Sequence, residues 1–223
     1  MSDRASQRSA APARPLLIGL TGPIGCGKST IGRLLAGQGG RLIDADALAR
    51  RATEPGQPAL ADVRARFGDA VFTDNELDRP ALAGIVFADQ AALLDLEAIV
   101  HPHVRRLVEL ELGRAVDDGV PFVALEAIKL VEGGLAERCD EVWIVDCPPA
   151  TQRARLARRR LPVADVERRL STQGEHLAER LRATLAGRVP TRLVSTSGTL
   201  ADTRRVAVAA LQDALRRQER TPH

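Results

Sequence analysis

One stretch near the N-terminus constrains this chain more than any other. Residues 16–30 read LLIGLTGPIGCGKST, an apolar run that leads into the spacing GxxxxGKS over residues 22–29. Glycines at these positions let backbone N–H groups turn inward around a phosphate, because no Cβ blocks the approach. The lysine adds positive charge beside the β- and γ-phosphates of a nucleotide, and the serine hydroxyl can bind Mg²⁺. The pattern predicts a buried strand, a phosphate-binding loop and a helix from Lys28 to about Gly37.

Composition limits the size, the compartment and the partners of the chain. Its 223 residues are enough for one large domain, or for one domain with insertions. The net charge of +3 demands no polyanionic partner, and four Phe, one Trp and no Tyr argue against a base-stacking surface for nucleic acids. No apolar stretch approaches the roughly 18 residues of a membrane span. We expect a small-molecule substrate, no nucleic-acid or membrane partner, and a monomer or weak homo-oligomer.

The three cysteines show no metal-binding spacing and are odd in number, which favours free thiols in a reducing compartment. We therefore expect a cytoplasmic protein. Residues 1–14 are rich in Arg, Ser and Ala without an apolar core; they faintly resemble an organellar presequence, but we interpret them as a disordered tail. A single domain is expected over residues 15–218.

Two aspartates follow the second predicted strand. Arg41–Ile43 forms that strand, Asp44-Ala45-Asp46 follows, and a helix is expected from Ala47 to about Thr53. Acidic residues at the carboxyl end of a parallel strand lie where open α/β sheets bind ligands. One aspartate is expected to cap the helix. We assign Asp44 as the cap, because it lies further outside the helix, and Asp46 as the carboxylate that faces the phosphates.

The segment from residue 57 to 118 is predicted to be helical throughout, with helices over residues 59–67, 79–87, 90–99 and 103–116. Pro102 is expected in the first turn of the last helix. For His101, a turn histidine bonded to backbone and a contact to substrate remain equal alternatives. In a protein with a phosphate-binding loop, such a helical insertion (about residues 47–118) usually holds the second substrate.

Three further strands complete the predicted sheet. The third, at residues 120–125, ends at Glu126, a position suited to a Mg²⁺ ligand beside the phosphate-binding loop. The fourth covers residues 141–147 and is apolar enough to be central, and the fifth covers residues 192–196. A helix from Leu200 to about Arg216 is expected to close the domain, with the last residues frayed from 218 onward.

An arginine-rich segment follows the fourth strand. Five arginines lie within eight residues, namely Arg153, Arg155, Arg158, Arg159 and Arg160. Three interpretations are open: a solvated basic face, a nucleic-acid patch, and a lid (about residues 149–185) whose arginine stabilises a transferring phosphoryl group. We favour the lid.

Taken together, these motifs resemble the dephospho-coenzyme A kinase family from residue 16 to about residue 215. The specific matching features are GLTGxIGxGKST at 19–30 and IDAD at 43–46. The weaker matches follow in the family's order: Glu54-Pro55-Gly56, Phe67-Gly68, His101-Pro102, Val145-Asp146, Thr151-Gln152, Arg159 and Gln173. The resemblance implies a three-layer α/β/α kinase with a five-stranded parallel sheet, a helical acceptor-binding insertion and a helical lid. It also implies ATP and Mg²⁺, and phosphorylation of the 3′-hydroxyl of dephospho-CoA, the last step of CoA synthesis.

The same resemblance assigns roles to particular residues. Asp46 is implied to be the base that accepts the hydroxyl proton, with Lys28 and Arg159 as further catalytic residues. Nucleotide binding is implied for Thr21, Gly22, Gly25, Cys26, Gly27, Lys28, Ser29 and Thr30, and Mg²⁺ binding for Ser29 and Glu126. A catalytic thiol is the alternative for Cys26, but we interpret it as a small residue that fills the loop.

The sequence departs from the family pattern in two places. Where the family usually has Asp-x-Pro-Leu-Leu-x-Glu, this chain has Glu-Ala-Ile-Lys-Leu-Val-Glu at 126–132, and the family's Asn-Gly turn is Ser197-Gly198. These changes concern contacts to the acceptor and to adenine more than the chemistry. Three other functions remain as alternatives: another small-molecule or nucleoside monophosphate kinase, a non-catalytic nucleotide-binding protein, and a nucleic-acid binder that uses the arginine helix.

Overall fold

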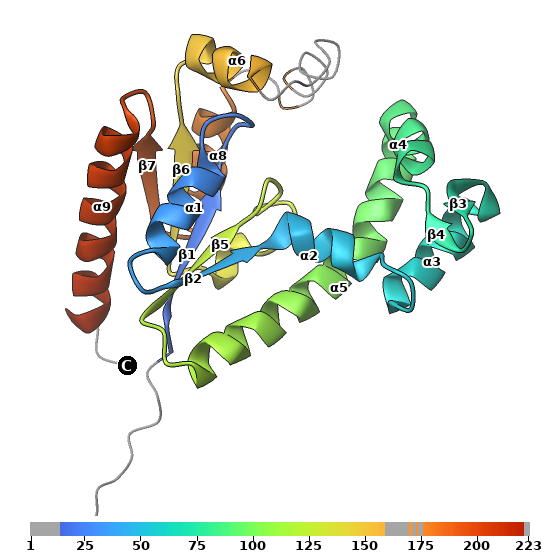
Figure 1. Ribbon diagram of the computed structural model, residues 1–223, viewed down its shortest axis with the longest axis horizontal. Coiled ribbons are helices and arrows are strands. Elements are labelled where there is room, and N and C mark those ends of the chain that lie inside the picture. The colour runs from blue at the N-terminus through green and yellow to red at the C-terminus, as the bar shows by residue number, and fades with distance from the viewer. Residues whose placement is uncertain (1–13, 159–169, 171–172, 174–175, 221–223) are drawn as a thin grey trace, which may run out of the picture.

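The predicted parallel sheet is present and lies at the centre of the structure (Figure 1). The computed structural model describes residues 14–158, 170, 173 and 176–220, and in this part of the chain the main sheet has five strands in the order β2-β5-β1-β6-β7. All of its pairings are parallel. The strands are β1 (Leu16–Thr21), β2 (Arg41–Asp44), β5 (Phe122–Glu126), β6 (Glu141–Asp146) and β7 (Thr191–Ser195).

Helices cover both faces of this sheet, because its central strands are apolar on both sides. On one face, α1 (Lys28–Ala36) and α9 (Leu200–Arg220) pack on alternate residues of β1, β5 and β6, among them Ile18 and Trp143. On the other face, α2 (Ala45–Ala52), α5 (Gln90–Asp117) and α8 (Leu177–Leu185) pack on the intervening residues. The three-layer α/β/α architecture predicted from the sequence is therefore confirmed.

The insertion between β2 and β5 has its own small core and extends away from the sheet (Figure 1). It contains α2, α3 (Pro58–Phe67), α4 (Arg79–Ala88) and α5. The expectation that it is entirely helical is wrong, because β3 (Phe72–Thr73) and β4 (Glu76–Leu77) form an antiparallel hairpin. The two residues between these strands, Asp74 and Asn75, both have positive φ (50° and 66°), as a type I′ hairpin turn requires.

The predicted helix boundary at His101-Pro102 is also wrong. A single helix, α5, runs through both residues, with Pro102 in its interior. An interior proline costs a helix about 3 kcal/mol, because it removes a backbone hydrogen bond and crowds the preceding turn. Here the helix packs against the sheet through Val104 and Val108 and against α3 and α4 further out, and we attribute its continuity to this packing.

The C-terminal helix is longer than predicted. It continues to Arg220, so the expectation that the chain frays from Gln218 is wrong for residues 218–220. Gln218 Nε2 donates a hydrogen bond to the carbonyl of Arg14 (3.3 Å), and Arg217 pairs with Glu141 at the start of β6. These contacts hold the last turns of the helix on the sheet.

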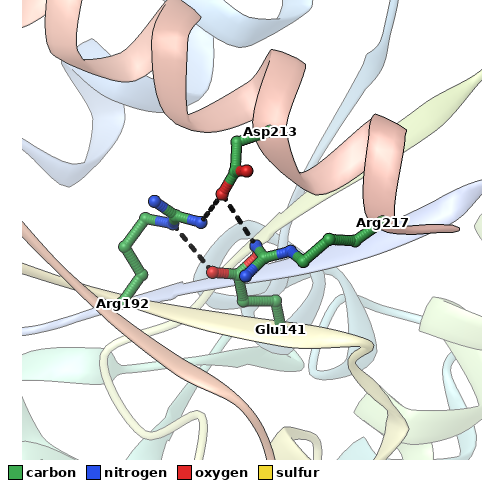
Figure 2. Close-up of polar contacts among 4 residues, drawn as sticks. All are labelled: Glu141, Arg192, Asp213 and Arg217. Carbon is green, nitrogen blue, oxygen red and sulfur yellow. Dashed lines mark hydrogen bonds and ion pairs between the residues drawn. The ribbon is translucent and has the colours of Figure 1, made fainter.

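Figure 2 shows the ion-pair network to which Arg217 belongs. Glu141 is buried and accepts hydrogen bonds from Arg192 Nε (2.8 Å) and Arg217 Nη2 (2.7 Å). Asp213 on α9 also pairs with both arginines. The network ties β6, β7 and α9 together near the amino ends of the strands.

The predicted lid region, residues 149–185, begins with the helix α6 (Pro149–Ala157) and ends with α8. Residues 159–169, 171–172 and 174–175 of this region lie outside the described residues, as does nearly all of the predicted N-terminal tail. Among the helices that the structure describes, none is both long and apolar enough to cross a membrane.

Candidate active site

The phosphate-binding loop connects β1 to α1 and depends on its glycines. Gly22, Gly25 and Gly27 have φ angles of 130°, 80° and 93°, which residues other than glycine rarely adopt. At Gly22 a Cβ would also lie 2.2 Å from the carbonyl oxygen of Val145. Gly27 caps α1 without any side-chain hydrogen bond, so no side-chain cap competes with an anion for the N–H groups at this helix N-terminus.

Lys28 lies along the loop. Its ammonium group donates hydrogen bonds to the carbonyls of Gly22 (2.7 Å) and Pro23 (3.2 Å), and the side chain is buried. The positive charge is thereby held beside the same loop whose glycines allow close approach. This is the placement that the sequence pattern predicts for a lysine that neutralises nucleotide phosphates.

Two glutamines hold the loop at Ile24. Gln173 Oε1 accepts a hydrogen bond from the Ile24 N–H (2.8 Å), and Gln152 Nε2 donates to the Ile24 carbonyl (2.8 Å). Both glutamines match the family pattern, but the sequence alone assigns them no role. Both glutamines bond to backbone groups of Ile24, which any residue would offer, so only the tertiary structure shows that they hold the loop.

An arginine from α6 supports the other end of the loop. Arg155 donates to the Thr196 hydroxyl (2.9 Å) and carbonyl (2.7 Å), and the Thr196 hydroxyl donates to the Cys26 carbonyl (2.6 Å). Arg155 Nη1 also reaches the Cys26 carbonyl at 3.5 Å. Arg155, one of the arginines considered for the lid, is therefore anchored beneath the phosphate-binding loop. The sequence pattern carries no signal for this role of Arg155 or for Thr196.

Cys26 contributes its backbone to the loop while its thiol points into the core. The thiol is fully buried and accepts a hydrogen bond from the Cys147 thiol, with the sulfurs 2.7 Å apart. Burial raises the pKa of the Cys26 thiol, and the contact with Cys147 raises it further. A buried thiol that resists ionisation is a poor nucleophile. This supports the interpretation of Cys26 as a small residue that fills the loop.

Ser29 and Glu126 form a pair at the start of α1. The Ser29 hydroxyl donates to Glu126 Oε1 at 2.6 Å. Glu126 ends β5 and is buried; burial raises the pKa of its carboxyl, whereas the Ser29 hydrogen bond and Lys28 lower it. Mg²⁺ at nucleotide sites commonly takes one or two protein oxygens and completes its shell with phosphates and water. The donor set of this pair fits such an ion.

The two aspartates after β2 have separate roles. Asp44 Oδ1 accepts a hydrogen bond from the Ala47 N–H (3.0 Å) and caps α2, which confirms the assignment of Asp44 as the cap. Asp46 lies in the first turn of α2. Burial raises the pKa of Asp46, as does the charge of Asp44, whereas the Ile128 N–H, Lys28 and Arg50 lower it. Asp46 thus lies within the electrostatic reach of Lys28 in the phosphate-binding loop.

Asp46 also borders a cavity of about 260 Å³ between α2, α4, α5 and the segment after β5. Most of the lining is apolar: Ala45, Ala49, Leu77, Leu82, Leu96, Val100, Val104, Ala127 and Leu135. His101 lies on the wall, and burial is the main cause that lowers its pKa. Of the two alternatives for His101, its position on the cavity wall favours the substrate contact. Asp46 therefore lies beside both the phosphate-binding loop and an apolar cavity.

Comparison with known proteins agrees with this geometry. Residues 16–187 match the model of one protein family, whose description is dephospho-CoA kinase. The chain belongs to the dephospho-CoA kinase family. It is 42% identical to a dephospho-CoA kinase of Moorella thermoacetica over 88% of this chain and 91% of that protein.

Solved structures support the family fold. A crystal structure of a Thermus thermophilus protein matches with a TM-score of 0.74 and 35% identity, over 90% of this chain and 97% of that one. The dephospho-CoA kinase of Campylobacter jejuni matches with a TM-score of 0.62 and 21% identity, over 91% and 98% of the two chains, and likewise has this fold.

The altered segment of this family member, residues 126–132, keeps contacts at the site. Glu126 accepts a hydrogen bond from Ser29, and the backbone N–H of Ile128 lowers the pKa of Asp46. Lys129, where the family pattern has leucine, lies on the cavity wall and forms an ion pair with Glu97 on α5. The substitutions in residues 126–132 therefore change the charge of the cavity wall. The group of this segment that acts on Asp46 is a backbone N–H, which does not depend on the side chain at that position.

The remaining predicted site residues lie around the loop. Thr21 is buried at the end of β1, and its hydroxyl donates to the Ile128 carbonyl (3.4 Å). Thr30 is in the first turn of α1, with its N–H bonded to the Gly27 carbonyl (3.0 Å). Arg159 lies outside the described residues, so its assignment to the lid stays a prediction.

Proposed function

We propose that this protein is a phosphotransferase with an alcohol group as acceptor. It moves the γ-phosphoryl group of ATP to the 3′-hydroxyl of dephospho-CoA and yields CoA and ADP, the last step of CoA synthesis. The observation that carries the proposal is the position of Asp46 between the phosphate-binding loop and the apolar cavity, in a chain that belongs to the dephospho-CoA kinase family.

The loop and its supports bind the nucleotide. Backbone N–H groups of residues 25–30 would surround the β-phosphate, and Lys28 would neutralise charge on the β- and γ-phosphates. Ser29 and Glu126 would hold Mg²⁺, which when bound would supply positive charge beside the phosphates. Because phosphoryl transfer has a loose transition state, positioning and charge neutralisation account for most of the catalysis. Arg159 would add a further positive charge from the lid.

Asp46 orients the acceptor hydroxyl and accepts its proton. Its raised pKa supports this role, because a base whose pKa lies closer to the working pH transfers protons more effectively. The Ile128 N–H favours the charged carboxylate and so limits the rise in its pKa. The apolar lining of the cavity suits the pantetheine arm of the acceptor, whereas the charged side chains near Asp46 suit its nucleotide end.

Acceptor preference tests this proposal. ADP release from Mg·ATP is measured with dephospho-CoA, with a panel of nucleoside monophosphates and with shikimate. Turnover with dephospho-CoA should exceed turnover with every other acceptor. A clear preference for another acceptor would overturn the acceptor assignment and leave a small-molecule kinase, and no ADP release above background with any acceptor would overturn the kinase itself.

Two substitutions test the assigned roles. Lys28→Ala should nearly abolish turnover. Asp46→Asn should lower kcat by roughly 10²- to 10⁴-fold, the usual contribution of a general base, while ATP binding is largely kept. The matched control is Asp44→Asn, which removes a neighbouring charge but retains a side chain able to cap α2. A near-normal kcat for Asp46→Asn would show that the base is a different group.

A further inference from the structure

The walls of the cavity carry three basic side chains, and two of them are already engaged by other groups. Lys129 is paired with Glu97. Arg79 Nη2 donates hydrogen bonds to the Arg50 carbonyl (2.9 Å) and the Thr53 hydroxyl (3.0 Å). The guanidinium of Arg50, in contrast, makes no hydrogen bond or ion pair with any residue in the part of the chain that the structure describes, and it is exposed at the cavity wall.

Arg50 shares its helix face with Asp46. The two residues are four positions apart on α2, and side chains with this spacing have Cβ atoms about 5–6 Å apart on one face of a helix. Both line the cavity, and the positive charge of Arg50 lowers the pKa of Asp46 against the effect of burial. The hydrogen bond from Arg79 to the Arg50 carbonyl fixes this part of α2 against α4.

The chemistry of the acceptor gives this arrangement a purpose. In dephospho-CoA the 3′-hydroxyl and the 5′-diphosphate are attached to the same ribose. A ribose whose hydroxyl approaches Asp46 therefore places its diphosphate within reach of a long side chain one helical turn away. A diphosphate close to a carboxylate and to the phosphates of a second nucleotide needs a compensating positive charge. The planar guanidinium of arginine binds phosphate oxygens in pairs, which fixes orientation as well as charge.

We propose that Arg50 binds the 5′-diphosphate of the acceptor and in this way holds its ribose 3′-hydroxyl at Asp46. The inference rests on the proposed function, and it goes beyond it by assigning the acceptor's diphosphate to one side chain. Arg50 is then a substrate-binding residue for the acceptor and makes no contribution to ATP binding.

The test compares Arg50→Gln with wild type and with a matched control, Arg51→Gln. Arg51 is the next residue on α2, pairs with Glu111 (3.5 Å) and is not part of the cavity lining. KM and kcat are measured for dephospho-CoA and for ATP, and dephospho-CoA binding without ATP is measured by calorimetry. Circular dichroism and thermal melting check that each variant folds. Arg50→Lys is a second variant, which keeps the positive charge but loses the planar guanidinium.

Arg50→Gln should raise KM and Kd for dephospho-CoA by roughly 10- to 100-fold, the loss expected for a hydrogen bond between charged groups. KM for ATP should stay within about threefold of wild type, since Arg50 lines the acceptor cavity. Arg51→Gln should match wild type in every constant, and Arg50→Lys should recover part of the lost affinity.

Two results would overturn the assignment of Arg50: a KM for dephospho-CoA as little changed in Arg50→Gln as in Arg51→Gln, or a raised KM for ATP with an unchanged KM for dephospho-CoA. Wild-type turnover tests the proposed function separately. If wild type binds dephospho-CoA in the calorimeter but transfers no phosphoryl group to it, the proposed function fails, while the comparison of Kd between wild type and Arg50→Gln still decides the role of Arg50. If wild type does not bind dephospho-CoA at all, both fail.

Discussion

The anchoring of the phosphate-binding loop by Arg155 leads to a quantitative prediction. In the variant Arg155→Met, the side chain keeps much of its length but loses its donors to Thr196 and Cys26. Thr196 is buried, so its carbonyl would lose the hydrogen bond from Arg155 in a site with little access to water. An unpaired buried acceptor costs about 1–3 kcal/mol, and loss of the bond to the Thr196 hydroxyl adds about 1 kcal/mol.

We therefore expect Arg155→Met to lower the free energy of unfolding by about 2–4 kcal/mol. In a protein of this size that corresponds to a fall in Tm of roughly 5–15 °C. The loop should not detach completely, because the Thr196 hydroxyl still donates to the Cys26 carbonyl. Looser positioning of the loop should raise KM for ATP about tenfold, since small displacements of a binding group are costly in catalysis.

The matched control is Arg153→Met on the same helix. Arg153 is exposed, and substitutions at such surface positions usually change stability by less than about 0.5 kcal/mol. Thermal and urea unfolding of both variants gives the stability difference, and steady-state kinetics at varied ATP gives KM. If Arg155→Met unfolds at the same urea concentration as Arg153→Met, the hydrogen bonds of Arg155 do not support the loop. A loss of stability with an unchanged KM for ATP would limit their role to the fold.

Three further predictions concern acidic residues. Because burial raises the pKa of Asp46, its charge destabilises the fold above that pKa and has no such effect below the usual carboxyl pKa of about 4, where Asp46 is protonated in both the folded and the unfolded state. Thermal melts should therefore show a higher Tm for Asp46→Asn than for wild type at pH 7–8, and this difference in Tm should shrink as the pH falls toward 4. A difference in Tm at pH 4 as large as that at pH 7–8 would contradict this reasoning. Asp44→Ala should lower the free energy of unfolding by about 0.5–2 kcal/mol through loss of the cap on α2, and Asp44→Asn should restore most of it in urea titrations. Glu141→Gln should lower the free energy of unfolding by about 1–3 kcal/mol in the same titrations, because it weakens two hydrogen bonds to arginines (Figure 2). The KM values for ATP and dephospho-CoA should stay unchanged, because the network lies at the amino ends of the strands, and a change in either KM would contradict this.

Much of the sheet could be predicted because its signals are local. The apolar runs of β1, β5 and β6 are long enough to mark buried parallel strands, and their order along the chain with intervening helices fixes the fold class. The capping role of Asp44 could also be predicted from its position alone, because a helix cap is decided within three residues. The confirmed cap left Asp46 as the carboxylate free to face the site.

The failed predictions share a different cause. Pro102 is a helix breaker by propensity, but it lies inside α5 because packing at both ends of that helix outweighs the local cost. The hairpin of β3 and β4 is only two residues long on each side, too short for periodicity to reveal. Arg155 is one of five arginines within eight residues, and nothing in the sequence distinguishes the one that bonds to Thr196, 41 residues later.

The sequence by itself determined the phosphate-binding loop, the parallel sheet around it and the acidic residues at the strand ends, since each depends on neighbours within a few positions. Only the tertiary structure decided what lies opposite the loop. The cavity is assembled from α2, α4, α5 and the segment after β5, which are separated by up to about 90 residues and meet through packing. The positions of Arg50 in the cavity and of Arg155 under the loop were decided in the same way, because the partners of a long charged side chain depend on which distant elements the core brings beside it.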